Sequence, residues 1–199
     1  MSEVKVNKIS PRSGTDVTLG DSGDTFTIPS GATITNSGTA TGFGKVLQVV
    51  SAVKTDTAST TSSTLASTGL EAAITPSATS NKVLILISAN MGTKDDVAPY
   101  FQINRDSTVL TGALGDAASS RVRTAGRTQY QYSSYNIFPV PIIYLDSPSS
   151  TSALTYKLMW AQGAPTSSFV SYLNRSQQDA DTGYSGRSSS TITLMEIAG

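Results

Sequence analysis

The sequence predicts an all-β protein, in which a short N-terminal β-shaft precedes a larger β-sandwich. Apolar residues alternate with polar ones over short segments, and no window shows a sustained 3.6-residue apolar period. Serine, threonine and β-branched residues are heavily used, which favours strands and turns over helices. Clusters of glycine, proline, asparagine and serine separate the apolar segments.

Residues 1–44 are predicted to form short β-rungs punctuated by glycine turns. Apolar residues alternate with hydroxylated ones in small groups that end at Gly20, Gly31 and Gly38. Such short strands bury too little apolar surface to fold alone. The rungs are therefore expected to stack on one another or on copies from other chains, as in a fibre shaft. The apolar rung positions are Val17, Leu19, Phe26, Ile28 and Ile34.

Residues 45–199 are predicted to form the second domain, because the strands lengthen from Lys45 onwards. Turn clusters separate the strands, as at residues 75–81 and 146–152. The number and spacing of strands are typical of a jelly-roll or tumour-necrosis-factor-like β-sandwich. The expected strands are residues 45–54, 70–75, 82–91, 99–104, 129–135, 137–145, 153–161, 168–173 and 191–197.

The strand at residues 82–88 is apolar on both faces. Val83 and Ile85 point one way and Leu84 and Leu86 the other. An antiparallel strand usually keeps one face in water, so we expect both faces to be covered. One would meet the sandwich core, and the other a second layer or a neighbouring subunit. The alternative is a central strand lying under a loop.

Two further strands carry local signals. Pro139 and Pro141 each lack a backbone N–H on the same side of their strand, which predicts an edge strand. Trp160 shares a face with Leu154, Tyr156 and Leu158. We therefore expect Trp160 to pack in the core, although a lone tryptophan could also stack on a ligand.

Composition argues against several function classes. The chain has no cysteine and no histidine, which removes disulfides, thiol nucleophiles, histidine-based triads and the usual zinc ligands. The net charge is zero, so no basic surface for nucleic acid is expected. The N-terminus lacks a secretory signal, and the apolar run Val83–Ile87 is too short to span a bilayer. We expect synthesis in the cytosol and no membrane insertion.

No catalytic residue and no cofactor site are predicted. Aspartate pairs could in principle supply two carboxylates for sugar hydrolysis or help to bind calcium, but they lie in polar turns and are expected to be solvated. No phosphate-binding or dinucleotide-binding motif is present. The protein is therefore predicted not to be an enzyme. The aspartate pairs are Asp21/Asp24, Asp95/Asp96 and Asp179/Asp181.

Two segments, residues 119–135 and 174–187, are candidates for ligand binding because they combine arginines with tyrosines. Arginine and tyrosine side chains suit sugars, acidic polysaccharides and protein partners. The alternative is that both segments line a subunit interface or hold loops through hydrogen bonds. The candidate residues are Arg121, Arg123, Arg127, Tyr130, Tyr132, Tyr135, Arg175, Tyr184 and Arg187.

The chain resembles fibre proteins of tailed bacteriophages, particularly those of marine bacteria. The N-terminal phrases Lys5-Val-Asn-Lys-Ile-Ser-Pro-Arg-Ser-Gly14 and Val17–Gly38 are similar to the shafts of such fibres. Further segments are similar to their tip domains, and the resemblance covers nearly the whole chain. These segments are Val46–Val50, Tyr144–Pro148, Thr155–Lys157, Asn174–Ser176 and Ser190–Ala198.

The resemblance implies a homotrimeric virion protein with no catalytic residues. Residues 1–44 would contact other virion proteins, and the head would contact the host cell surface, with a surface glycan as a candidate receptor. At 199 residues the chain is short for a complete tail fibre. A head fibre or capsid decoration protein is therefore the alternative, and a polysaccharide-degrading enzyme is a weaker one.

Overall fold

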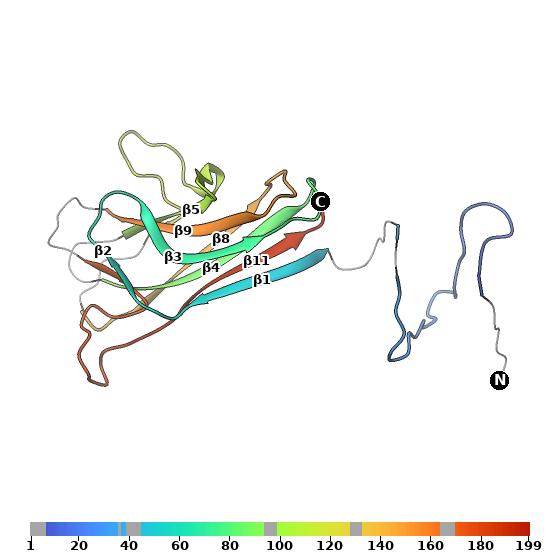
Figure 1. Ribbon diagram of the computed structural model, residues 1–199, viewed down its shortest axis with the longest axis horizontal. Helices are drawn as coiled ribbons and strands as arrows, with labels where there is room; N and C mark the ends of the chain where they lie inside the picture. Colours follow the sequence, from blue (N-terminus) through green and yellow to red (C-terminus); the bar gives the residue numbers. More distant parts are fainter. Residues whose placement is uncertain (1–6, 36, 39–44, 94–98, 128–132, 164–169) are drawn as a thin grey trace. The chain divides into compact units, whose positions relative to one another are not determined.

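The structure is a computed structural model that describes residues 7–35, 37–38, 45–93, 99–127, 133–163 and 170–199 (Figure 1). The chain divides into two compact units, Met1–Phe43 and Gly44–Gly199. No α-helix occurs among the described residues, so none is present there that could cross a membrane. The predicted all-β class is confirmed.

The second unit consists of two antiparallel sheets (Figure 1). The first has the order β1-β11-β4-β10-β2, and β8 pairs with β4 as well. The second has the order β3-β9-β5-β6, and β7 also pairs with β5. The strands are β1 (Val46–Lys54), β2 (Ala58–Thr60), β3 (Ala66–Ile74), β4 (Lys82–Gly92), β5 (Pro99–Arg105), β6 (Thr108–Val109), β7 (Gly126–Arg127), β8 (Phe138–Asp146), β9 (Leu154–Gln162), β10 (Ser171–Leu173) and β11 (Ser190–Ile197).

The long strands and the short β10 agree with predicted strands, whereas the short β2, β6 and β7 do not. β2, β6 and β7 were not expected, because two or three residues carry no alternating pattern and are fixed only by pairing with a neighbour. The strand expected at residues 129–135 lies mostly outside the described residues. Its described end, residues 133–135, forms a turn and no strand, so that part of the prediction is wrong.

The described part of the N-terminal unit contains turns but no strands. Gly20 and Gly31 have positive φ angles of 75° and 85°, which glycine adopts without strain. The apolar rung positions are exposed, as at Phe26 and Leu19. The expected β-rungs therefore do not form within residues 7–35 and 37–38 of one chain. The physical reason is that no neighbouring strand supplies hydrogen bonds or covers the apolar side chains.

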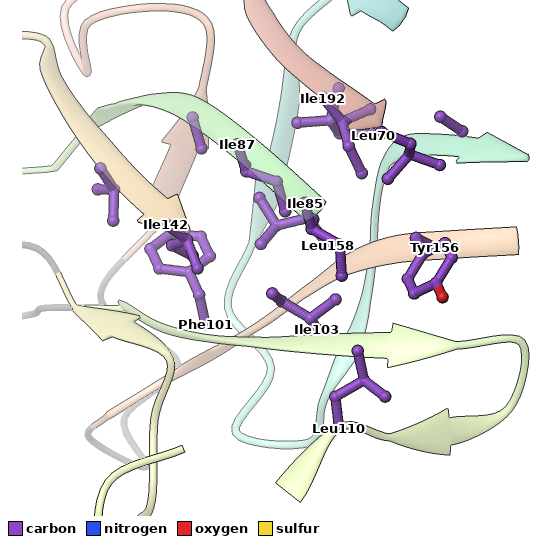
Figure 2. Packing of buried hydrophobic residues seen from close by; sticks show 14 of the residues in the cluster. Leu70, Ile85, Ile87, Phe101, Ile103, Leu110, Ile142, Tyr156, Leu158 and Ile192 are labelled. Atoms are coloured by element: carbon purple, nitrogen blue, oxygen red, sulfur yellow. The ribbon is translucent and has the colours of Figure 1, made fainter. Parts of the chain in front are cut away.

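The core lies between the two sheets and is made by alternate residues of the long strands (Figure 2). Ile85 and Ile87 of β4 face Phe101 and Leu158 of the other sheet. Trp160 is only 2% exposed and belongs to the same cluster, which confirms its predicted place in the core. These side chains fill the sandwich, so its interior offers no ligand site through Trp160.

The outer face of the first sheet carries an apolar row that crosses four strands. Leu84 of β4 pairs with Leu145 of β8 on one side and Met195 of β11 on the other. Met195 in turn pairs with Val49 of β1, which is 56% exposed. Ile143 extends the row and is 70% exposed. The predicted apolar character of both faces of β4 is thus real, but within one chain only the inner face is fully buried.

The two prolines of β8 agree with an edge position. Pro139 pairs with Asn90 and Pro141 with Ser88, both on β4. Among the described strands β4 is the only partner of β8. The edge prediction is therefore confirmed, since a strand lacking these N–H groups loses little when no second strand lies beside it.

Candidate functional site

The loop between β10 and β11 is anchored by Asn174. This residue is fully buried and has a positive φ of 62°, a conformation that asparagine tolerates better than most residues. Its Nδ2 donates to the backbone oxygens of Lys54 (2.8 Å) and Asp56 (2.9 Å). The Ser190 hydroxyl donates to Asn174 Oδ1 at 2.5 Å. The base of the loop is thereby fixed to the end of β1.

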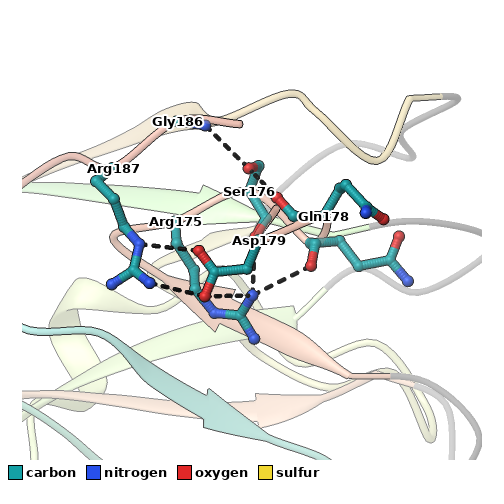
Figure 3. Close-up of polar contacts among 7 residues, drawn as sticks. Arg175, Ser176, Gln178, Asp179, Gly186 and Arg187 are labelled. Carbon is teal, nitrogen blue, oxygen red and sulfur yellow. Dashed lines mark hydrogen bonds and ion pairs between the residues drawn. The ribbon is translucent and has the colours of Figure 1, made fainter. Parts of the chain in front are cut away.

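Hydrogen bonds close the loop into a compact unit (Figure 3). Arg175 and Arg187 form an isolated β-bridge. The Ser176 N–H donates to the Gly186 oxygen at 3.2 Å, and the Gly186 N–H donates to Ser176 Oγ at 3.1 Å. Ser176 Oγ also donates to the Gln178 oxygen at 2.6 Å. The side chains of residues 177–185 are therefore presented on a tied loop.

Asp179 joins the two arginines of this loop (Figure 3). Arg187 donates from Nε (3.0 Å) and Nη2 (2.7 Å) to the two carboxylate oxygens, which is a bidentate pair. Arg175 Nη1 lies 3.5 Å from Asp179 Oδ2, and its guanidinium lies 3.8 Å above the centre of the Tyr172 ring. One carboxylate thus compensates two guanidinium groups, and their orientations are fixed.

Two of the candidate ligand-binding tyrosines, one from each candidate segment, are in contact with each other. The ring centres of Tyr135 and Tyr184 are 6.1 Å apart with the rings tilted by 58°. The Gln178 N–H donates to the Ser134 oxygen at 2.9 Å and ties the two segments together. Tyr135 is 46% exposed and Tyr184 79% exposed. We call Tyr135, Tyr184, Arg175, Asp179 and Arg187 the loop cluster.

A surface depression lies along the same loop. It has a volume of about 310 Å³ and is open to solvent. Its wall is mostly polar and offers carboxylate, hydroxyl and guanidinium groups. The lining residues are Asp179, Ala180, Asp181, Thr182, Ser185 and Arg187.

The other predicted arginines lie elsewhere in the described structure. Arg123 Nε donates to the Gly115 oxygen (2.6 Å) and Nη2 to the Thr111 oxygen (3.2 Å), so this side chain holds its own loop. Arg121 is exposed in the same loop, and Arg127 is exposed in β7. No described contact joins these three arginines to the loop cluster. Tyr130 and Tyr132 lie outside the described residues.

The sequence interpretation missed the roles of Asp179 and Asn174. Asp179 was expected to be solvated, but it accepts hydrogen bonds from Arg187 and pairs with Arg175. Its spacing from Arg175, four residues, was the available signal. The anchoring role of Asn174 could not be predicted, because the backbone oxygens that its side chain binds, those of Lys54 and Asp56, lie about 120 residues earlier in the chain.

Two carboxylates are buried in the described part of the chain, and both are occupied by protein groups. Asp146 Oδ2 accepts hydrogen bonds from Arg105 Nη1 (2.6 Å) and the Tyr156 hydroxyl (2.8 Å). Burial and the neighbouring Asp146 raise the pKa of Tyr156 above its usual range. The carboxylate of the other residue, Glu196, accepts hydrogen bonds at both oxygens. Both groups stabilise the fold.

The remaining acidic residues form no recognisable centre among the residues described. Asp24 accepts a hydrogen bond from the Asp21 N–H at 2.8 Å within a turn, as expected for a local role. Asp95 and Asp96 lie outside the described residues. Within the described ranges, no group of three acidic side chains is placed to hold a metal ion.

Comparison with models of known protein families finds no match, and comparison with curated proteins finds none either. The candidate site is therefore interpreted from its own geometry and chemistry.

Proposed function

We propose that this protein is a virion fibre protein of a tailed bacteriophage whose β-sandwich binds the host cell surface through the loop cluster. The observation that carries the proposal is the exposed Tyr135–Tyr184 pair, whose two segments are tied by a hydrogen bond and whose loop also holds a cluster of paired charges. Exposed tyrosines offer a large contact area at low entropic cost, and rigid presentation favours binding. The proposed role is binding without catalysis.

The strand order supports a jelly-roll head. One sheet contains β1-β11-β4 followed by β8, and the other contains β3-β9-β5 followed by β7. Ignoring the short β2, β6 and β10, the first strand pairs with the last, and successive strands alternate between the sheets except for β5 and β7, which follow one another within the second sheet. This is the arrangement of a jelly roll built from two Greek keys. The loop cluster then lies at the end of the head where β4 finishes, because β10 pairs with Met91 and Gly92.

The outer face of the first sheet supports a homotrimer. In its apolar row, Val49 and Leu145 are exposed and Met195 and Leu84 are partly exposed in one chain. Of the charged residues in β1, β4, β8 and β11, Lys82 lies on this outer face, and it lies at the margin. An apolar face whose charge is confined to its margin packs well against a second copy, since few like charges meet across a symmetric contact. The N-terminal rungs would find their missing neighbours in the same assembly.

The exposed apolar residues of the N-terminal unit favour attachment to other virion proteins. Phe26, Leu19 and Ile9 are all more than half exposed within the single chain. This attachment is compatible with a tail fibre and with the second candidate function, a capsid head fibre or decoration protein. Labelling of intact virions with an antibody separates the two, because decoration predicts label over the capsid and a tail fibre predicts label at the tail.

Replacing Tyr135 and Tyr184 together with alanine is expected to abolish most host binding. Both rings are exposed, so the change removes contact area without opening the core. We expect at least a tenfold loss of affinity, about 1.4 kcal/mol or more. The measurement is binding of labelled full-length protein to a panel of bacterial strains, with adsorption of the phage as the competing reaction.

Val122→Ala is the matched control, because Val122 is exposed on a different loop. It should bind like the unaltered protein. Failure of the unaltered protein to bind any strain that adsorbs the phage, or full binding by the double variant, would contradict the proposal.

A further inference from the structure

We infer that the depression along residues 179–187 is a subsite for an uncharged saccharide unit, with Tyr184 as the adjoining stacking surface. This inference rests on the proposed function and specifies its ligand. The sequence left neutral sugars, acidic polysaccharides and proteins open. The geometry of the loop separates these classes through charge, hydrogen-bonding groups and size.

The charges in and beside the subsite cancel when Arg175 is counted, which pairs with Asp179 but does not line the depression. Arg175 and Arg187 contribute two positive charges, while Asp179 and Asp181 contribute two negative charges. Both arginines are already paired with Asp179, so neither offers a bare guanidinium to a sulfate, phosphate or uronate. Asp181 lines the depression and would repel an anion placed there. A polyanion therefore gains little from this surface.

The hydrogen-bonding groups match neighbouring sugar hydroxyls. The Asp181 carboxylate can only accept, the Thr182 hydroxyl can donate or accept, and Arg187 can only donate. A saccharide hydroxyl is both donor and acceptor, so a wall that offers both kinds of group can satisfy neighbouring hydroxyls. The short turn that spans Thr182 and Ser185 also carries Tyr184, whose exposed ring offers an apolar face for the C–H side of a sugar ring.

The size of the depression fits a short segment of a glycan. About 310 Å³ lies at the lower end of ligand-pocket volumes, which run from about 300 Å³ upwards. An open site of this size buries little of its ligand, so each copy should bind weakly. Tight attachment would come from several copies engaging one polymer, where linkage raises the effective concentration. The probe should accordingly be a cell-surface polymer and not a monosaccharide.

The test measures binding of the full-length protein to bacterial cells that it recognises, under treatments that distinguish ligand chemistries. For a neutral saccharide, affinity should change less than about twofold between about 50 mM and about 500 mM sodium chloride, because no counterions are released. Excess heparin should not compete. Periodate oxidation of the cells, which cleaves neighbouring diols, should abolish binding, whereas protease treatment should not.

Asp181→Ala locates the subsite. It should weaken binding to these cells at least about fivefold, by removing one charge-assisted acceptor. Asp116→Ala, which changes an exposed aspartate on another loop, is the matched control and should bind normally. An unaltered affinity for Asp181→Ala would overturn the assignment of the subsite.

The remaining outcomes also decide the question. A tenfold or greater loss with salt, or displacement by heparin, would show an acidic ligand and overturn the inference. Binding that survives periodate but not protease would show a protein receptor and do the same. Both of those results are compatible with the proposed host-binding function. Absence of binding to any host strain would instead contradict that function.

Discussion

Glu196→Ala is expected to lower the free energy of unfolding by about 3 kcal/mol, since it removes a buried carboxylate that accepts one buried and three part-buried hydrogen bonds. Glu196 Oε1 accepts hydrogen bonds from the Ser77 N–H (2.6 Å), the Ser77 hydroxyl (2.7 Å) and Asn81 Nδ2 (2.6 Å). Its Oε2 accepts from Gln48 Nε2 at 2.6 Å. The carboxylate thus ties β1 and the loop before β4 to β11.

The same carboxylate gives the protein a defined pH dependence. Burial alone would raise the pKa of Glu196, but the hydrogen bonds from Gln48, Asn81 and Ser77 outweigh it and lower the pKa from 4.5 to about 2. A carboxylate whose pKa is lower in the folded state than in the unfolded state stabilises the protein at pH values above its unfolded-state pKa. That stabilisation, about 3 kcal/mol, should be present above pH 4.5 and be lost as the pH falls towards 2.

Chemical denaturation at neutral and acidic pH measures both effects. Glu71→Ala is the matched control, because Glu71 is half exposed and lies 3.9 Å from Lys157 in a surface pair. It should cost no more than about 1 kcal/mol. A Glu196→Ala variant as stable as the control at pH 7, or with the same acid sensitivity as the unaltered protein, would refute the structural role of Glu196.

Gly92→Ala is expected to displace the loop cluster and to destabilise the head by about 3 kcal/mol. A methyl group at Gly92 would collide with the backbone oxygen of Arg175 and lie 2.9 Å from the Cα of Ser176. Backbone atoms at the base of a tied loop cannot move aside as a flexible side chain can, so overpacking here is costly. Host binding should fall together with stability, because Arg175 begins the loop that presents Tyr184.

Gly115→Ala is the control for this glycine, since nothing lies within 4 Å of a methyl group added there. It should retain both stability and host binding. Thermal unfolding and cell binding of the two variants provide the comparison. Normal binding by Gly92→Ala would show that the close approach of β4 and the loop does not position the cluster.

Much of the sandwich could be predicted because its long strands carry clear alternation. Leu154, Tyr156 and Leu158 are buried on one face of β9, as their spacing indicates. The edge position of β8 could be predicted because Pro139 and Pro141 lack the backbone N–H that a second neighbouring strand would need. The short strands β2, β6 and β7 escaped prediction because they depend on tertiary pairing. The N-terminal rungs did not form strands because one chain does not supply their neighbours.

The candidate site was only partly predictable. Residue type drew attention to Tyr135, Tyr184, Arg175 and Arg187. The structure pairs the two tyrosines with each other and the two arginines with Asp179 of the same loop. The sequence also grouped Arg123 with Tyr135, but Arg123 bonds to backbone oxygens of its own loop. Proximity along the chain does not reveal which loops meet in a sandwich, because strands adjacent in space are often distant in sequence.

The most direct measurement is an experimental structure of the purified full-length protein in its solution assembly, by electron cryomicroscopy or crystallography. We expect three copies whose β8-β4-β11-β1 faces meet around the symmetry axis, with Leu84 and Met195 buried. Tyr135 and Tyr184 should remain exposed at one end of each head. A monomer would contradict the proposed homotrimer, and an assembly that buries those two tyrosines between subunits would contradict the proposal that the loop cluster binds the host.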